Sequence, residues 1–223
     1  MDRISSSQTK TCMGITISKV VPMLREIGRD FCARGWVLGT SGNFSAVLSR
    51  QPLRLAITAS GASKGDIRLS DLLTIGPDGR AVGKPAGKST GRPSAEAHLH
   101  VTVVRTRHAS AVLHTHSVWS TMLSELHGSR GGLAIGGFEM LKGLEGVATH
   151  QHSEWLPILE NDQDIRGLAR RVQATLEKFP AAHGFLLRGH GLYTWGDNLA
   201  QARRHVEIFE FLLETTGRME SHS

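Results

Sequence analysis

Cysteine is scarce in this sequence, and long apolar runs are absent. Only Cys12 and Cys32 occur among the 223 residues, too few for a disulfide framework or a cysteine-based zinc site. No run reaches the roughly 18 apolar residues that a membrane-spanning helix needs, and residues 1–13 lack the apolar segment of a secretory signal. We therefore expect a cytoplasmic protein with no membrane partner, whose first 13 residues form a flexible tail.

Aromatic residues are also few, at 5% of the chain, and the basic residues form no block. Nucleic-acid binding is disfavoured, because single-stranded nucleic acid is usually held by aromatic side chains on which bases stack. The 26 lysines and arginines against 20 acidic residues still give a net charge of +6. A positive field of this kind attracts small anions, so we expect a small phosphorylated substrate and no nucleic-acid partner.

Hydrophobic residues make up 39% of the sequence, enough for a folded core. Their spacing predicts helices and short strands in alternation, with several strands joined by tight turns. This favours an α/β fold with a mixed, partly antiparallel sheet over a fully parallel one. The expected helices are 17–34, 95–107, 118–126, 162–178 and 197–217, the expected strands are 43–48, 53–58, 73–75, 81–82, 111–115, 185–187 and 192–195, and 131–137 is expected to be a glycine-rich connection.

Histidine is abundant, with 12 residues. His114 and His116 end the apolar run that begins at Ala111, and side chains two apart on a strand share a face. His190 stands between two glycines, which leave its ring accessible. A pair and a distant third histidine would supply three neutral nitrogen ligands and leave a fourth position open, as a catalytic zinc site requires.

Two other histidine pairs have the same spacing. His98 and His100 lie in a predicted helix, where side chains two apart diverge, so a shared ion is disfavoured. His150 and His152 lie in a loop-like segment and remain a rival metal site. Most histidines bind no metal, so spacing alone neither establishes a metal site at His114 and His116 nor excludes one at His150 and His152.

Three polar segments could bind an oxyanion. The loops 39–43 and 58–65 offer hydroxyls, an amide and flexible backbone N–H groups. Ser94 stands at the start of a predicted helix, where the helix dipole favours an anion. Each segment alone could equally be an ordinary turn. No P-loop and no dinucleotide-binding glycine motif is present, so nucleotide binding has no support.

Two acids are candidates for proton transfer. Glu139 has apolar neighbours, and a desolvated carboxyl has a raised pKa that suits general acid–base work. Glu96 lies in the first turn of a predicted helix, where it could simply complement the helix dipole. Glu145, close to Glu139 in the sequence, is the alternative assignment for the same role.

Taken in order, these motifs resemble the class II aldolase/adducin family. The resemblance covers residues 17–219 and rests on five motifs in sequence. They are Gly42-Asn43-x-Ser45, Thr58-x-Ser60-Gly61, Pro93-Ser94-x-Glu96, His114-x-His116 and His190-Gly191.

The resemblance implies a three-layer α/β/α fold with a central mixed, largely antiparallel sheet, in a single catalytic domain over residues 14–223. It implies one zinc ion per subunit, held by His114, His116 and His190, and a homotetramer with its sites near subunit interfaces. The substrate phosphate would be bound around Gly42, Asn43, Ser60, Gly61 and Ser94.

Within the family, the segment from Glu139 to Gly143 is most similar to a branch that removes water from a phosphorylated sugar. This similarity implies a zinc-dependent lyase with Glu139 as general acid–base, and leaves the role of Glu96 open. Tyr193 is the only tyrosine and adjoins the histidine motif, which argues against the C-terminal tyrosine that the aldolases use. The alternatives are a sugar-phosphate aldolase or pentose-phosphate 4-epimerase and, less favoured, a non-catalytic adducin-like interaction module.

Overall fold

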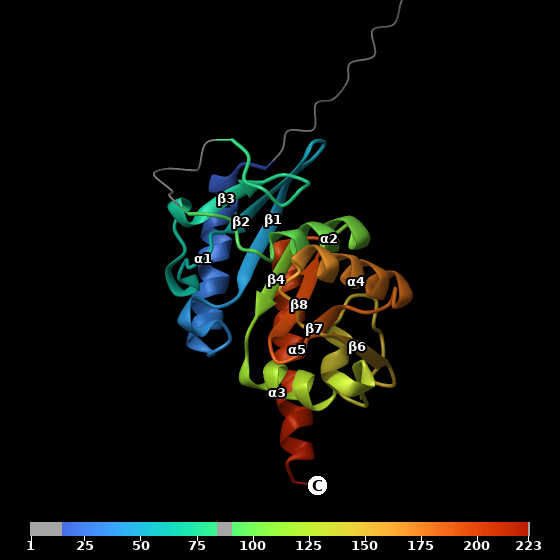
Figure 1. Ribbon diagram of the computed structural model, residues 1–223. Helices are drawn as coiled ribbons and strands as arrows, with labels where there is room; N and C mark the ends of the chain where they lie inside the picture. The colour runs from blue at the N-terminus through green and yellow to red at the C-terminus, as the bar shows by residue number, and fades with distance from the viewer. Residues whose placement is uncertain (1–14, 84–90, 223) are drawn as a thin grey trace, which may run out of the picture.

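The computed structural model describes residues 15–83 and 91–222 (Figure 1). The expected tail, 1–13, lies outside the described residues. The helices are α1 (Ile17–Ala33), α2 (Ala97–Arg107), α3 (Val118–Leu126), α4 (Ile165–Lys178) and α5 (Leu199–Glu220), with the short 3₁₀ helices η1 (Leu38–Thr40), η2 (Lys64–Asp66), η3 (Leu69–Asp71), η4 (Gly128–Arg130) and η5 (Glu139–Gly143). The strands are β1 (Asn43–Arg50), β2 (Leu53–Thr58), β3 (Leu72–Ile75), β4 (Ala111–Thr115), β5 (Gly132–Gly136), β6 (Ser153–Leu159), β7 (Gly184–Leu187) and β8 (Gly191–Gly196).

These strands form one eight-stranded sheet in the order β3-β2-β1-β4-β8-β7-β6-β5. Every neighbouring pair is antiparallel except β6 and β7, which are parallel. The sheet is therefore mixed and largely antiparallel, as the sequence predicted.

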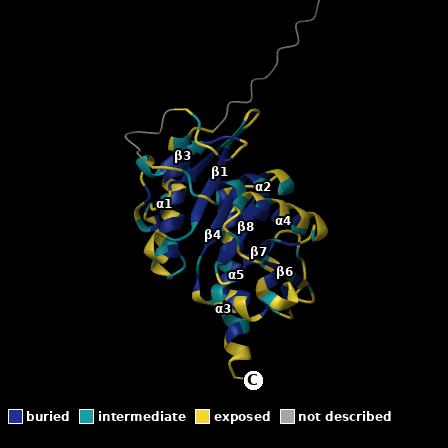
Figure 2. Cartoon of the chain, in the orientation of Figure 1, coloured by how far each residue is buried: buried dark blue, intermediate teal, exposed yellow. Residues whose placement is uncertain are grey.

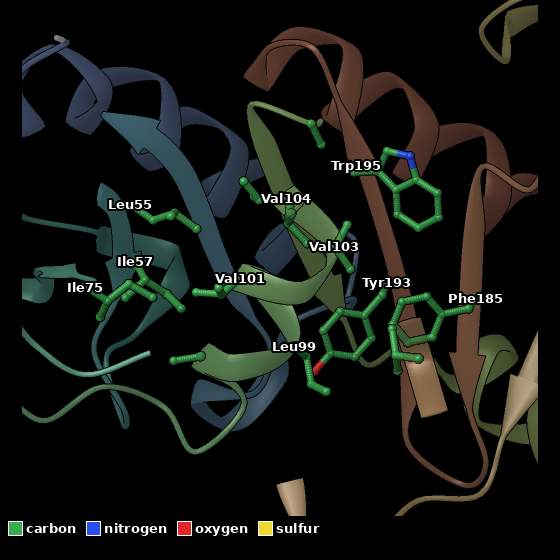
Figure 3. Close-up of a cluster of buried hydrophobic side chains, with 14 of the residues drawn as sticks. Leu55, Ile57, Ile75, Leu99, Val101, Val103, Val104, Phe185, Tyr193 and Trp195 are labelled. Atoms are coloured by element: carbon green, nitrogen blue, oxygen red, sulfur yellow. The ribbon is translucent and has the colours of Figure 1, made fainter. Parts of the chain in front are cut away.

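Helices cover both faces of the sheet, which gives the three layers. On one face α2 and α4 pack against side chains such as Leu55, Ile57 and Phe185 (Figure 3). On the other face α1, α3 and α5 pack against the alternate residues, such as Ala56 and Leu186. Side chains alternate across a strand, so each central strand presents one set of residues to each helical layer. Both sets are apolar, and the central strands are therefore buried (Figure 2).

Residues 132–136 form strand β5, so the prediction of a connection over 131–137 is wrong. The strand pairs with β6 and turns Leu133 and Ile135 into the core. The glycines of this segment obscured its strand character in the sequence. Gly132 is explained by packing, because a Cβ there would lie 2.2 Å from the ring of Trp155. The missing side chain makes room for an aromatic ring on the neighbouring strand.

Smaller differences occur at helix starts. The helix expected from residue 95 begins at Ala97, because the Ser94 hydroxyl accepts the backbone N–H of Glu96 and holds the preceding turn. The helix expected from residue 162 begins at Ile165, where the Asp164 carboxylate accepts the N–H of Gly167 as a cap. Within the described residues, none of the helices combines the length and apolarity needed to cross a membrane.

Candidate metal and substrate site

Three histidines meet where strand β4 ends. His114 is the fourth residue of β4, His116 follows the strand, and His190 lies in the turn between β7 and β8. The Nε2 atoms of His114 and His116 are 2.8 Å apart, and that of His190 lies 3.2 Å from the first and 3.1 Å from the second. Strand β8 runs beside β4, and this pairing brings the distant histidine to the other two.

This triangle fits a divalent metal ion. Two nitrogens bound to a tetrahedral zinc at about 2.0 Å lie roughly 3.3 Å apart, close to the spacing seen here. The Nδ1 of His114 donates to the carbonyl of Leu192 at 2.8 Å, which leaves a lone pair on its Nε2. Within the described residues, these are the histidines that cluster closely enough to share one ion.

Burial keeps the three imidazoles neutral. It lowers the pKa of His114 well below its usual value, with His116 and His190 adding repulsion. Burial, and then the nearby His190 and Lys64, lower the pKa of His116 to about 4. Burial also lowers the pKa of His190. Metal ligands must be unprotonated, so the environment prepares all three at neutral pH.

The rival histidine pairs have other partners. His100 is fully buried and bonds to Ser45 and Asn43. His150 lies 3.3 Å from Glu139, and His152 is bonded to the buried carboxylate of Glu154 at 2.8 Å. Among the described residues, neither pair belongs to a group of three or more side chains that could share one ion.

Glu96 faces the histidine triangle. Its Oε1 lies 3.2 Å from the Nε2 of His190 and 3.7 Å from that of His114. A carboxylate oxygen beside two of the three neutral nitrogens adds a further electron-pair donor to the site, which suits a cation. The acid whose role the sequence left open therefore lies at the metal site of its own chain.

A chain of buried hydrogen bonds fixes the orientation of Glu96. The Ser45 hydroxyl donates to Nδ1 of His100 at 2.7 Å, and Nε2 of His100 donates to Oδ1 of Asn43. The Nδ2 of Asn43 donates to Glu96 Oε2 at 2.5 Å and to Ser94 Oγ at 3.3 Å. Burial lowers the pKa of His100 to about 3, so its ring is neutral and has one donor and one acceptor, as this chain needs. Sequence reasoning missed His100 because it tested that residue only as a metal ligand.

The segments that carry the five residues expected to bind phosphate are linked to one another, and two of them adjoin this cluster. Gly42 precedes β1, and Asn43 is the first residue of that strand and pairs in register with His114. Ser60 and Gly61 follow β2, where the Ser60 N–H donates to the Arg92 carbonyl and a bridge joins Ala59 to Pro93. The same segment leads to Ser94, whose hydroxyl touches Asn43.

Gly42 is required by its surroundings. Its φ is +69°, and a Cβ there would lie 2.4 Å from the backbone carbonyl oxygen of His114. The close approach holds this loop against the strand that carries the metal ligands. The side chain of Asn43 is already used in bonds to Ser94 and Glu96.

Glu139 lies elsewhere in the chain. It begins η5, its side chain is 71% exposed, and its ion pairs are with Lys142 at 3.1 Å and His150 at 3.3 Å. The alternative acid, Glu145, accepts bonds from Gln201 and Arg204. Within one chain, the structure thus brings Glu96 to the histidines and gives Glu139 and Glu145 other partners.

Tyr193 packs directly on a metal-site histidine. Its ring stacks on that of His114 with centroids 3.8 Å apart and planes 11° apart, and on its other face lies Phe185 (Figure 3). The side chain is completely buried. The ring sandwich fixes the plane of the His114 imidazole.

A cavity of about 360 Å³ lies at the other end of these strands, lined by Arg107, His183, Trp195 and Gly196 among others. Trp195 and Gly196 end β8, whereas the metal site adjoins its start. The chemistry-bearing cluster is thus separate from this cavity.

Comparison with known families gives a match over most of the chain. The model described as "Class II Aldolase and Adducin N-terminal domain" matches residues 23–216. The methylthioribulose-1-phosphate dehydratase of Sorangium cellulosum is 44% identical over 202 residues, which cover 89% of this chain and 92% of the relative. The enzyme of the same name from Pseudomonas aeruginosa is 45% identical over 85% of this chain and 89% of its own.

Solved structures agree on the fold. An L-fuculose 1-phosphate aldolase superposes with a TM-score of 0.75 at 22% identity, covering 95% of this chain and 91% of the aldolase. The corresponding aldolase of Thermus thermophilus gives 0.70 at 23% identity, covering 93% of this chain and 100% of its own. At these identities the likeness concerns the arrangement of the backbone.

Proposed function

The chain belongs to the class II aldolase and adducin family, and on that premise we propose that it dehydrates 5-methylthioribulose 1-phosphate to 2,3-diketo-5-methylthiopentyl 1-phosphate. The observation that carries this proposal is the similarity to dehydratases of that substrate over most of both chains. The protein is then a hydro-lyase of methionine salvage. A cytoplasmic location suits a phosphorylated metabolite as substrate.

His114, His116 and His190 hold the metal ion, which we propose is one zinc per subunit. When bound, such an ion polarises the C2 carbonyl of the substrate and so makes the C3 proton more acidic. The stacked Tyr193 and the carbonyl of Leu192 keep the ring of His114 in place. The loops around Gly42, Asn43, Ser60, Gly61 and Ser94 hold the phosphate and orient the sugar.

Elimination of water needs a base at C3 and an acid at the C4 hydroxyl. Glu96 is the base in this proposal, because its carboxylate faces the histidines that surround the C2 end and Asn43 holds it there. It takes the C3 proton, the electron pair forms the C3–C4 double bond, and the C4 hydroxyl leaves with a proton as water. The resulting C3 enol then takes a proton at C4 and becomes the second ketone.

Glu139 remains the proposed acid that protonates the departing hydroxyl. Because its contacts in its own chain lie away from the histidines, we propose that it reaches the site of a neighbouring copy in a homotetramer. In support, Val118, Met122 and Leu126 of α3, four residues apart, are 65%, 54% and 64% exposed and begin two residues after His116. An exposed apolar stripe of this kind suits a subunit interface near the site.

The decisive experiment is to incubate the metal-analysed protein with 5-methylthioribulose 1-phosphate and follow the products by mass. Loss of one water supports the proposal. Two carbon fragments would indicate an aldolase, an unchanged mass with inverted C4 would indicate an epimerase, and no reaction in a protein without metal would indicate an interaction module.

Deuterium exchange separates the two acids. Glu139→Gln should still exchange the C3 proton of the substrate with solvent while losing dehydration, whereas Glu96→Gln should lose both. Mixing His114→Ala chains with Glu139→Gln chains should restore part of the activity, because one metal site of a mixed tetramer then receives an intact Glu139 from its neighbour. No recovery on mixing would contradict the assignment of Glu139 to a neighbouring site.

A further inference from the structure

Lys64 is a buried lysine between the two loops beside the site. Lys64 is the first residue of η2, and 2% of its surface is exposed. Its Nζ donates to the carbonyl of Thr40 at 2.5 Å and to the carbonyl of Ala62 at 2.9 Å. One carbonyl belongs to the loop before β1 and the other to the loop after β2, so the ammonium group joins the two.

Among the described residues, the charge of this lysine has no direct counter-charge. Both hydrogen-bond partners are neutral carbonyls, and in the described part of the chain it forms no ion pair with a carboxylate. An ammonium group has three N–H donors, so one remains beyond the two bonds to Thr40 and Ala62. A buried charge without a partner is costly, and an anion bound beside it would offset that cost.

The electrostatics place this charge near the chemistry. Burial lowers the pKa of Lys64 to about 8, with Glu96 acting in the opposite direction, and the lysine in turn contributes to the lowered pKa of His116. The ammonium group is therefore still mostly protonated at neutral pH, and its charge interacts with both Glu96 and His116.

The backbone of Lys64 is held as firmly as its side chain. Helix α1 approaches so closely that a Cβ at Gly28 would lie 2.1 Å from the carbonyl oxygen of Lys64. A lysine fixed at both ends loses little further freedom when an anion binds, and this favours binding.

We propose that the Lys64 ammonium is the fixed positive charge of the substrate's phosphate site and makes the enzyme selective for the phosphorylated sugar. The inference rests on the proposed function, which supplies a phosphate monoester as ligand. Lysine binds phosphate as a compact point charge, and the hydroxyls of Ser60 and Ser94 lie on the adjoining segments. Lys64 would bind substrate and transition state alike, because the phosphate is remote from the reacting carbons.

The test is how strongly the enzyme prefers the phosphorylated sugar to the unphosphorylated sugar. For Lys64→Met we expect the ratio of kcat/KM for the phosphorylated sugar to that for the unphosphorylated sugar to fall about 10- to 100-fold, through KM, the size expected for a lost charged hydrogen bond. Lys19→Met, on the exposed side of α1, is the matched control and should leave the ratio unchanged. Equal losses for both sugars would show a purely structural role and overturn the proposal.

Direct binding separates this inference from the proposed function. By calorimetry, inorganic phosphate should bind the metal-loaded wild type and bind Lys64→Met, or the uncharged Lys64→Gln, at least tenfold more weakly. If the wild type fails to dehydrate the sugar yet shows this difference, the lysine serves another phosphorylated substrate and the proposed function is what fails. Equal binding by folded variants would overturn the role of Lys64.

A measurement on the wild type needs no variant to fold. Saturating inorganic phosphate should shift the NMR signal of the Lys64 side chain in isotope-labelled wild type and leave that of Lys19 unchanged. A Lys64 signal that phosphate does not shift would overturn the proposal.

Discussion

The amide of Asn43 donates to the carboxylate of Glu96 at 2.5 Å, although 53 residues separate them in the chain. The bond leaves Oε1 of Glu96 directed at His190 and His114. Asn43 is itself held by His100. A residue that resembles a phosphate ligand in the sequence thus also orients the acid beside the metal ligands.

Replacing Asn43 by aspartate should therefore impair catalysis more than substrate binding. Asn43→Asp removes the donor and sets two carboxylates against each other, so we expect kcat to fall about 10- to 100-fold. Steady-state kinetics and metal analysis check this, with metal content unchanged. An equal rise in KM with normal kcat would instead assign Asn43 to phosphate binding alone.

Metal binding should depend on the three converging histidines and on no other histidine pair. His114→Ala and His190→Ala should each lose most of the bound metal and essentially all activity, because two nitrogen ligands seldom retain zinc. Elemental analysis after dialysis measures the content. His98→Ala and His150→Ala are matched controls, and a loss of metal in His150→Ala would revive the rival site.

The fold could be predicted from the sequence where the spacing of apolar residues along the chain shows which side chains are buried. A continuous apolar run predicted β4, the two-residue spacing along a strand placed His114 and His116 on one face at its end, and the flanking glycines indicated the turn of His190. Strand β5 escaped prediction because glycines occupy its first and last positions. Its strand character comes from pairing with β6 and from the ring of Trp155, which covers Gly132. Both are long-range contacts.

The site was harder to predict than the fold because its polar residues act through distant partners. Glu96 and Glu139 could not be ranked from local sequence, since the position of Glu96 depends on Asn43 and His100 across the sheet. Lysines are rarely buried, so nothing in a loop of serines and glycines predicted that Lys64 would be enclosed by the carbonyls of Thr40 and Ala62.

Tyr193 should matter for its ring and not for its hydroxyl. The ring stacks on His114. Within the described residues its buried hydroxyl makes no hydrogen bond of normal geometry, although it lies near enough to Glu96 for that carboxylate, after burial, to raise the pKa of Tyr193. Tyr193→Phe should keep metal, activity within about threefold and stability within about 1 kcal/mol, whereas Tyr193→Ala should lose about 3–5 kcal/mol. Denaturant unfolding and kinetics test this, and a large loss of activity in Tyr193→Phe would give the hydroxyl a chemical role.

Gly28 should be intolerant of even one added methyl group. A Cβ there meets the backbone of Lys64, so Gly28→Ala must push η2 away from α1 at a cost of about 1–3 kcal/mol. The shift should also weaken inorganic phosphate binding if Lys64 holds that anion. Met23→Ala, at an exposed position of the same helix, is the control, and equal melting temperatures for the two variants would contradict the close contact.

Glu210 should make stability depend on pH near neutrality. It lies in α5 beneath the metal-ligand segment, 2% exposed, and its Oε1 accepts from the Thr115 hydroxyl at 2.8 Å. Burial raises its pKa from 4.5 to about 7, although bonds to Ser117 and Thr115 act in the opposite direction. Between these two values the folded state holds a proton that the unfolded state has released, so the free energy of unfolding falls as pH rises.

The stabilisation by this proton is complete below about pH 4.5 and lost above about pH 7, and the shift corresponds to about 3 kcal/mol. Glu210→Gln, which resembles the protonated acid, should remove that decline, so wild type and variant should diverge in stability from pH 5 to pH 8. Denaturant unfolding at several pH values, on metal-free protein to exclude ligand titration, measures the divergence. Parallel pH profiles would mean that Glu210 stays ionised in the folded protein, with its buried Oε2 bonded to a group that offsets the charge.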